Sequence, residues 1–202
     1  MRLLTALAAV LLTQPAYAQI ETGATPALEG GSAQEEKTLV GDVGMPGLRP
    51  TPEHLWLKQL EGKWESEAKI TLPGGGEMTN RGVSTNRMLG GFWLVSEAVA
   101  DMGGQKMTAV QQIGYDPEKK QFVGTWVDGT NAHIWRYTGK LSDDRTTLIL
   151  EASGPNFMTG QGTANFRDTY RIVSKDTMEA VSYVEKGGEW QEVMKAEVKR
   201  VD

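Results

Sequence analysis

The chain has 202 residues, a formal net charge of -5 and no cysteine. The lack of cysteine excludes disulfides, thiolate metal sites and a cysteine nucleophile. The negative charge, with no basic stripe to offset it, argues against nucleic acid as a partner.

The first eighteen residues have the pattern of a secretory signal peptide. Arg2 is followed by an apolar run over residues 3–12, a break at Pro15 and a small-residue pattern that ends at Ala18. The apolar run is about half of the roughly 20 residues needed to span a bilayer, so it is too short for a membrane anchor. We therefore expect cleavage after Ala18, export to the periplasm or the medium, and no membrane span after cleavage.

Residues 19–49 follow as a predicted flexible linker. The segment is rich in Gly, Ala, Pro and Glu and has no sustained apolar periodicity. It cannot bury enough apolar surface to offset the entropy lost on ordering. The remaining residues, 50–202, have the usual size of one domain.

The folded part is predicted to begin with a short helix over residues 51–60. Thr51 is a good N-cap, and Pro52 suits the first helical position because its missing N–H costs nothing there. Gly62 provides a suitable end. We expect this helix to cover one mouth of the structure that follows, and we expect His54 in its first turn to be solvated.

Segments of alternating polarity, separated by turn residues, then recur at intervals of about 8 to 14 residues, which is typical of a sandwich or a barrel. Ten strands are predicted, over residues 64–72, 78–89, 92–101, 106–115, 121–128, 131–141, 146–152, 163–174, 177–185 and 189–201. Ten consecutive strands without crossover helices favour a closed sheet, because closure removes both edges. The predicted fold is therefore all-β: a single antiparallel up-and-down β-barrel of about ten strands with a short N-terminal capping helix.

Two of the connections carry specific expectations. Gly129 and Thr130 are predicted to join their strands as a two-residue hairpin turn. Residues 153–162 form a longer connection that holds three glycines and a proline. Because loops of that length usually lie over a mouth of the barrel, this segment is the candidate lid.

Aromatic residues on two neighbouring strands form the candidate ligand site. Alternation places His133, Trp135 and Tyr137 on one face, and Trp126 lies on a common face of the preceding strand. Facing inward, these side chains would form an aromatic pocket with a few polar groups, the usual composition of a small-molecule site. The alternative is that the aromatic side chains only fill the core and that His133 hydrogen-bonds locally.

A carboxylate lies on an otherwise apolar face of the strand over residues 163–174. Asp168 shares this face with Tyr170, and its burial would cost several kcal/mol unless it is paired. The expected partner is a tyrosine hydroxyl or an arginine such as Arg81 or Arg87. The functional interpretation is a polar anchor for a ligand, and the structural alternative is a buried pair.

The sequence offers few groups for a metal or for catalysis. His54 and His133 are the only histidines, so two or three neighbouring histidines for zinc are not available, and we predict no metal and no cofactor. No nucleophile elbow, phosphate loop or dinucleotide fingerprint is present. An acid–base pair of His133 and Asp168 is the enzymatic alternative, because general acid–base work needs only two positioned groups.

Five short motifs, taken together, resemble a known family. They are Gly62 with Trp64, residues 89–94, residues 113–117, residues 122–126, and Phe166 to Asp168. With these motifs the chain resembles bacterial domain-of-unknown-function family 1579 over nearly all of residues 50–200. The resemblance implies a lipocalin-like barrel, related in shape to nitrobindins and fatty-acid-binding proteins, and it implies no established activity and no catalytic residues. Haem ligation by His133, by analogy with nitrobindins, would be an argument from fold alone.

These patterns favour an exported barrel that binds a small apolar or amphiphilic molecule inside. The residues predicted to line the site are Trp126, His133, Trp135, Tyr137, Asp168 and Tyr170. Two alternatives stay open: a small-molecule enzyme that uses an internal His/Asp pair, and a barrel with a solid core that serves as an interaction module of the cell envelope. The patterns identify neither the ligand nor the oligomeric state.

Overall fold

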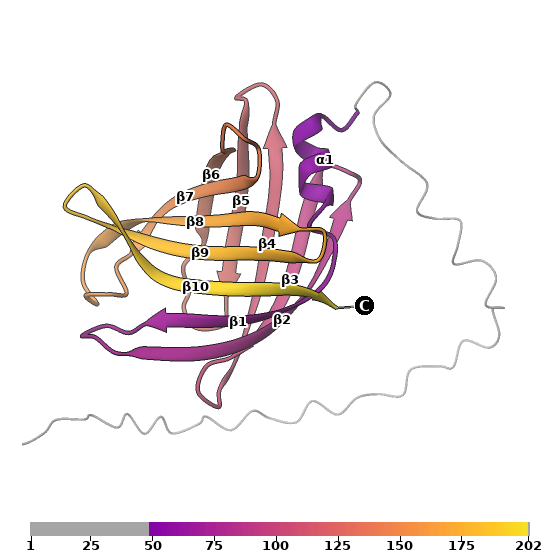
Figure 1. Ribbon diagram of the computed structural model, residues 1–202. Helices are drawn as coiled ribbons and strands as arrows, with labels where there is room; N and C mark the ends of the chain where they lie inside the picture. The colour runs from indigo at the N-terminus through magenta and orange to yellow at the C-terminus, as the bar shows by residue number, and fades with distance from the viewer. Residues whose placement is uncertain (1–48, 202) are drawn as a thin grey trace, which may run out of the picture. The chain divides into compact units, whose positions relative to one another are not determined.

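The computed structural model describes residues 49–201, which form a closed barrel of ten antiparallel strands with one short helix at one end (Figure 1). The elements are α1 (Pro52–Lys58), β1 (Gly62–Thr71), β2 (Glu77–Leu89), β3 (Trp93–Asp101), β4 (Lys106–Asp116), β5 (Gln121–Asp128), β6 (Trp135–Leu141), β7 (Thr147–Pro155), β8 (Thr163–Ser174), β9 (Thr177–Lys186) and β10 (Glu189–Val201). Each strand pairs with the next along the chain, and β1 pairs with β10. The predicted fold class is confirmed.

The N-terminal predictions are not tested by this structure. The predicted signal peptide and all of the predicted linker except Arg49 lie outside the described residues. Within residues 49–201, no helix combines the length and the apolar character needed to cross a bilayer.

Side chains alternate between the inside and the outside of the barrel along each strand. On β1, Trp64 and Ala68 are buried, whereas Glu65 and Glu67 are exposed. This period of two gathers the inward apolar residues of the ten strands into one interior, whereas others, such as Val83 and Val99, are exposed on the outer face.

Two glycines allow neighbouring strands to approach closely. A Cβ atom at Gly139 on β6 would overlap the carbonyl oxygen of Ile149 on β7 and would lie 2.7 Å from Leu150 Cδ2. A Cβ atom at Gly124 on β5 would overlap the carbonyl oxygen of Gln112 on β4. Glycine inside a strand marks a tight bend or a close backbone approach, and here it lets β4 to β7 curve around the core.

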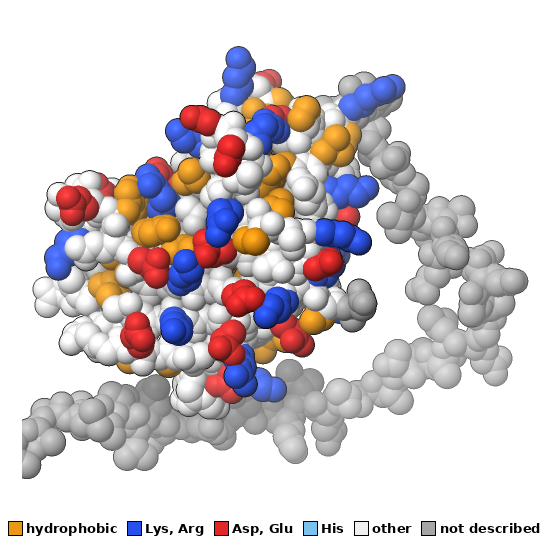
Figure 2. All heavy atoms as spheres, in the orientation of Figure 1, with side chains coloured by type: hydrophobic (Ala, Val, Ile, Leu, Met, Phe, Trp, Pro, Cys, Tyr) orange, Lys and Arg blue, Asp and Glu red, His pale blue; other side chains and the backbone are white. Residues whose placement is uncertain are grey.

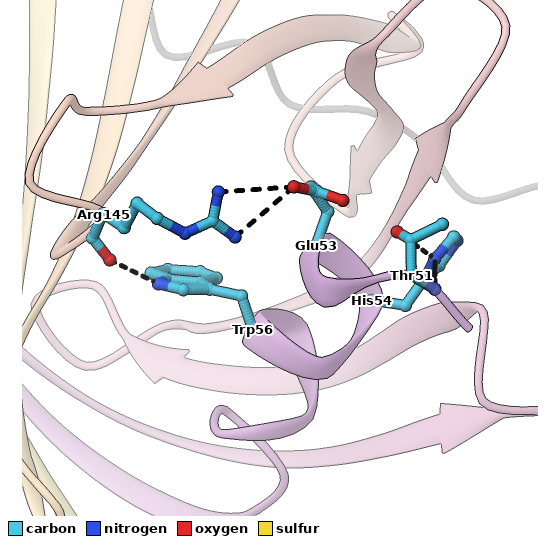
Figure 3. A network of polar contacts seen from close by, with 5 residues as sticks. All are labelled: Thr51, Glu53, His54, Trp56 and Arg145. Carbon is cyan, nitrogen blue, oxygen red and sulfur yellow. Dashed lines mark hydrogen bonds and ion pairs between the residues drawn. The ribbon is translucent and has the colours of Figure 1, made fainter.

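A hydrophobic core fills the end of the barrel beside α1, which we call the capped end. The helix and the turn after it contribute Trp56, Leu57 and Leu60 to this core. The Trp56 indole N–H donates to the Arg145 carbonyl oxygen at 2.8 Å, and the Arg145 guanidinium lies 3.3 Å from Glu53 Oε1 (Figure 3). The helix therefore covers one mouth of the barrel, as predicted.

His54 is buried, so the prediction that it is solvated is wrong. The Thr51 backbone N–H donates to His54 Nδ1 at 3.0 Å (Figure 3). The ring meets Phe92 edge-on at 5.3 Å and Tyr115 at 5.9 Å between ring centres, and only 4% of the residue is exposed. Burial lowers the pKa of His54, which therefore stays neutral and serves as a helix cap.

Arg200 on β10 seals the capped end from the opposite side. Its guanidinium donates to the carbonyl oxygens of Glu61, of Gln59 at 2.9 Å and of Lys175 at 3.2 Å. The guanidinium carbon also lies 4.1 Å from the centre of the Trp64 ring. One side chain thus joins the end of α1, the β8–β9 turn and β1.

The turns that follow β1, β3, β5, β7 and β9 lie at the other end of the barrel, which we call the distal end, because successive strands run in opposite directions. Here the predicted two-residue hairpin is wrong, since β5 ends at Asp128 and β6 begins at Trp135. The Asp128 carboxylate accepts hydrogen bonds from the Thr130 N–H at 2.8 Å and from the Asn131 amide at 3.2 Å. These bonds hold a longer turn over residues 129–134.

The outer face of β7 to β10 carries charges of both signs in ion pairs. Glu179 pairs with Arg171 at 3.1 Å and with Lys195 at 2.8 Å, and Glu151 pairs with Arg167 at 2.5 Å. Figure 2 shows acidic and basic side chains interspersed over this side of the barrel. Each exposed pair contributes at most about 1 kcal/mol, but together they keep the outer face close to neutral.

Candidate functional site

Part of the inner wall formed by β1 to β4 carries small side chains, although larger ones such as Trp64, Met78 and Leu94 point inward from the same strands. Small residues point inward from β1 to β4: Ser66, Ala68, Gly82, Ser84, Ser96, Ala98, Ala100 and Ala109. Large residues point inward from β5 to β8: Trp126, Trp135, Tyr137, Phe166 and Tyr170. Large side chains facing small ones leave more space than two bulky walls would, because small barrels are otherwise filled by their own side chains.

Several of the large inward residues are partly exposed, although the barrel is closed. Trp126, Trp135, Tyr170 and Met194 pack against the core without being fully buried. Met88, Tyr115 and Ile172 near α1 are also only partly buried, so partly exposed inward side chains occur at both ends of the barrel.

Five polar side chains form two hydrogen-bonded groups inside the barrel, which together we call the polar layer. The Tyr137 hydroxyl donates to Asp168 Oδ2 at 2.6 Å, and the Ser182 hydroxyl donates to Asp168 Oδ1 at 2.5 Å. The Tyr170 hydroxyl lies 3.0 Å from Gln111 Nε2. These residues come from β4, β6, β8 and β9, so the polar layer reaches across the lumen.

Asp168 has a hydroxyl partner of the predicted kind, but no arginine. Arg81 pairs with Glu67 at 2.9 Å on the outer surface, and Arg87 is exposed. Both arginines alternate to the outer face of β2, so of the two predicted kinds of partner the tyrosine hydroxyl is confirmed and the arginine is not.

Two members of the polar layer, Ser182 and Gln111, were not predicted. Ser182 lies directly opposite Asp168 in the β8–β9 register. That pairing depends on a register shift between Ile172 and Ser174, because counting back from Ser174 opposite Thr177 would have placed Tyr183 beside the carboxylate. Gln111 is a buried amide on the inner face of β4, and nothing local marks it as the partner of Tyr170.

Burial controls protonation in the polar layer. Burial raises the pKa of Asp168 above its ordinary value, although the hydrogen bonds from Ser182 and Tyr137 act in the opposite direction. Burial also raises the pKa of Tyr137 and of Tyr170. Both tyrosines therefore remain neutral hydroxyls over the physiological range.

The raised pKa of Asp168 predicts how its contribution to stability depends on pH. Between the ordinary carboxyl pKa of about 3.9 and the raised value, the folded protein keeps a proton that the unfolded chain has released. The free energy of unfolding contributed by Asp168 therefore falls as the pH rises through this window and is constant above it. Asp168→Asn should remove this fall. Urea unfolding of wild type and variant at several pH values from about 4 to 7 measures it, as the difference between their profiles of unfolding free energy against pH.

The control for this measurement is Asp143→Asn, which changes an exposed carboxylate on the β6–β7 turn. It should shift the profile little and leave its shape unchanged. Parallel profiles for wild type and Asp168→Asn would contradict the prediction.

An aromatic cluster lies at the distal end of the lumen. The Trp135 ring meets His133 at 4.9 Å and Phe166 at 5.1 Å between ring centres, both edge-on. Phe157 stacks on Phe166 at 4.9 Å between ring centres, and Met158 packs against the cluster of Phe166, Val184 and Val193. Phe157 and Met158 belong to the connection predicted as a lid, which is shorter than predicted because β7 continues to Pro155. The connection, residues 156–162, packs over the distal aromatic side chains.

His133 does not pair with Asp168. Its Nε2 atom is buried without a hydrogen-bond partner, and a Cβ atom at Gly154 would lie 2.7 Å from it. The ring therefore lies directly against the backbone of β7. The two residues share no hydrogen bond or ion pair, so the geometry does not favour an acid–base pair, and the covered Nε2 does not fit haem ligation in this arrangement.

The structure brings the six predicted site residues to the inner side of the barrel in separate groups. Tyr137, Asp168 and Tyr170 belong to the polar layer, and His133 and Trp135 belong to the distal aromatic cluster. Trp126 donates its indole N–H to Asp128 at 3.0 Å near the distal end. Their role in ligand binding stays a prediction. Across residues 49–201, no group of three His, Asp or Glu side chains could hold a metal ion.

Two solved structures are similar to this chain, and neither supplies an activity for it. One similar solved structure is that of Rv2717c from M. tuberculosis, with a TM-score of 0.54 and 14% identity, covering 76% of this chain and all of that chain. Another is the S-type phycobiliprotein lyase CPES from Guillardia theta, with a TM-score of 0.48 and 8% identity, covering 74% of this chain and 93% of that chain. At such low identity, the likeness to the first supports the fold alone, and the second match is too weak to support an argument.

No curated protein matches the sequence. The model of one family, described as "Protein of unknown function (DUF1579)", matches residues 49–200, which is most of the chain. This match agrees with the five motifs and with the closed barrel. The chain belongs to the DUF1579 family.

Proposed function

We propose that this protein is exported and binds a small amphiphilic molecule in the distal half of its barrel. The observation that carries the proposal is the polar layer, a carboxylate with hydroxyl and amide groups set among small and aromatic side chains. Mostly apolar pockets with a few placed polar groups are the usual form of small-molecule sites. The apolar part of the molecule would lie along Trp126 and Trp135, and its polar group would reach Asp168.

Export rests on the N-terminal sequence. Arg2, the apolar run over residues 3–12 and the Ala18 cleavage pattern support a periplasmic or secreted location. Since a molecule carried in the lumen would be acquired there, the protein should be isolated from the periplasm or the medium.

Native mass spectrometry of protein purified from that compartment tests both parts of the proposal. We expect a polypeptide mass that begins at Gln19, together with an extra mass that is lost on denaturation. A chain that still contains residues 1–18 would overturn export. The absence of extra mass, combined with no binding of the neutral fluorescent probe Nile red, would overturn ligand binding.

Trp135→Ala is expected to weaken binding of Nile red at least about tenfold, which corresponds to about 1.4 kcal/mol. The reason is that the indole forms part of the distal wall, and large aromatic side chains dominate the energetics of such contacts. A fluorescence titration measures the dissociation constant. The matched control is Trp190→Ala, since Trp190 lies on the outer surface with the Arg167 guanidinium 4.1 Å from its ring centre. Equal affinities for Trp135→Ala and wild type would place the site elsewhere.

One observation favours the interaction module as a second candidate function. Val83 and Val99 are neighbours in the β2–β3 register, and they are 54% and 37% exposed. They lie in a groove of about 650 Å³ on the outer wall of the barrel. This candidate would replace the first if the purified protein carried no extra mass and bound no probe.

A further inference from the structure

The distal half of the lumen holds two carboxyl groups without a positive side chain beside them. Asp168 and Asp128 point inward, and neither takes part in an ion pair among the described residues. Arg200 belongs to the capped end, where three carbonyl oxygens occupy it. Lys186, on the inner face of β9, lies at the exposed tip of the β9–β10 hairpin. His133 is directed against the β7 backbone.

The two hydroxyl groups beside Asp168 have no hydrogen left to donate to a ligand. Tyr137 and Ser182 both donate to the carboxylate, so each hydroxyl oxygen has only lone pairs left to offer. The carboxylate oxygens also keep unused lone pairs. This side of the polar layer therefore presents hydrogen-bond acceptors to the lumen.

The missing cation is a feature of the lumen rather than of the whole chain. On the outer wall, Glu151 and Glu179 lie within 3.1 Å of arginine or lysine nitrogens. Asp168, which is farther from bulk water, has only neutral donors. A carboxylate removed from water is costly without a countercharge, so a cation supplied by the ligand would gain most at this position.

The aromatic wall favours the same class of ligand. Trp126 and Trp135 are opposite each other in the β5–β6 register, and Trp135 contacts Phe166, two residues before Asp168 on β8. The faces of such rings attract ammonium groups. A carboxylate or phosphate ligand would instead place a second negative charge beside Asp168, and among the described residues only Lys186, at the exposed hairpin tip, offers a cation on the inner face of the distal half.

We infer that the ligand is a cationic amphiphile, whose amine or related N–H group pairs with Asp168 and whose apolar body lies along Trp126 and Trp135. This inference rests on the proposed function and deepens it. It separates this barrel from a fatty-acid carrier, because it assigns the polar end of the ligand the opposite charge.

Three probes with the same twelve-carbon chain test the inference: dodecylamine, dodecanol and dodecanoate. Each is used below its micelle concentration to displace Nile red from the full mature chain at neutral pH and low salt. We expect dodecylamine to displace the dye at a concentration at least about tenfold lower than dodecanol, with dodecanoate the weakest, because a charge-assisted hydrogen bond is worth that factor or more. In Asp168→Asn, the advantage of the amine over the alcohol should shrink to less than about threefold.

Ser182→Ala is the matched variant, since it removes one partner of Asp168 and leaves the carboxylate in place. It should keep the preference for dodecylamine, and its unfolding curve shows whether loss of a polar-layer hydrogen bond alone disturbs the fold. Displacement by none of the three probes would overturn the proposed function. Equal displacement by amine and alcohol, or a preference for dodecanoate, would overturn only the inference. A full amine preference in Asp168→Asn would overturn the role of Asp168.

Discussion

Gly139→Ala is expected to lower the free energy of unfolding by about 3 kcal/mol, at the upper end of what overpacking usually costs. A Cβ atom at this position would overlap the Ile149 carbonyl oxygen and lie 2.7 Å from Leu150 Cδ2. Leu150 is fully buried, so its side chain has no open space to enter. The backbones of β6 and β7 must therefore separate where they are directly paired, with Gly139 opposite Leu150 in the register.

Urea unfolding of purified variants measures this effect, and Gly129→Ala is its control. A Cβ atom at Gly129 would have its nearest contact at 3.6 Å from Thr108 Oγ1, an ordinary van der Waals distance. The control should therefore change the free energy by less than about 1 kcal/mol. Similar midpoints for the two variants would show that β6 and β7 can separate without cost.

Arg200→Ala is expected to cost about 2–3 kcal/mol, because it removes charge-assisted hydrogen bonds to carbonyl oxygens at the end of α1 and in the β8–β9 turn. The guanidinium also leaves the face of Trp64, which adds a smaller cation–π loss. Without it, the carbonyl oxygens of Gln59 and Glu61 keep no partner from β10. The helix should then detach from the barrel more readily than the strands separate.

Thermal and urea unfolding, combined with hydrogen exchange of residues 55–61, test this expectation. Arg81→Ala is the matched control, since the Arg81 side chain is 78% exposed and its ion pair with Glu67 lies on the outer surface. It should cost less than about 1 kcal/mol. If the two arginine variants were equally stable, Arg200 would not be the residue that seals the capped end.

The barrel could be predicted from the sequence because its determinants are local. Alternation along each strand and turn residues between strands are visible without knowledge of the partner strand. The one wrong hairpin shows the limit of this approach. Gly129 and Thr130 fit a tight turn, but Asp128 accepts hydrogen bonds from the residues that follow it and holds a longer one.

The parts of the site that could not be predicted depend on contacts between distant strands. Alternation places Asp168 inside, but only the closed barrel shows that Tyr137, rather than an arginine of β2, reaches it. His54 lies in a polar first turn that indicates exposure, and the rings of Phe92 and Tyr115 that bury it come from elsewhere in the chain. A sequence pattern gives the face of a strand, whereas the partner across the lumen depends on the barrel's closure and shear.

The seam between β1 and β10 has a consequence for how the chain reaches this fold. The two strands pair from Lys63 with Val201 to Ile70 with Met194. The barrel therefore cannot close until the last strand has formed beside the first. Until residues 189–201 arrive, β1 and β9 each keep an unpaired edge that can recruit another chain. Contacts between such distant segments make folding slow, and a chain without cysteine has no covalent link to hold an unfinished barrel. The unpaired edges of β1 and β9 therefore remain open to aggregation until residues 189–201 have been synthesised and have paired with both strands.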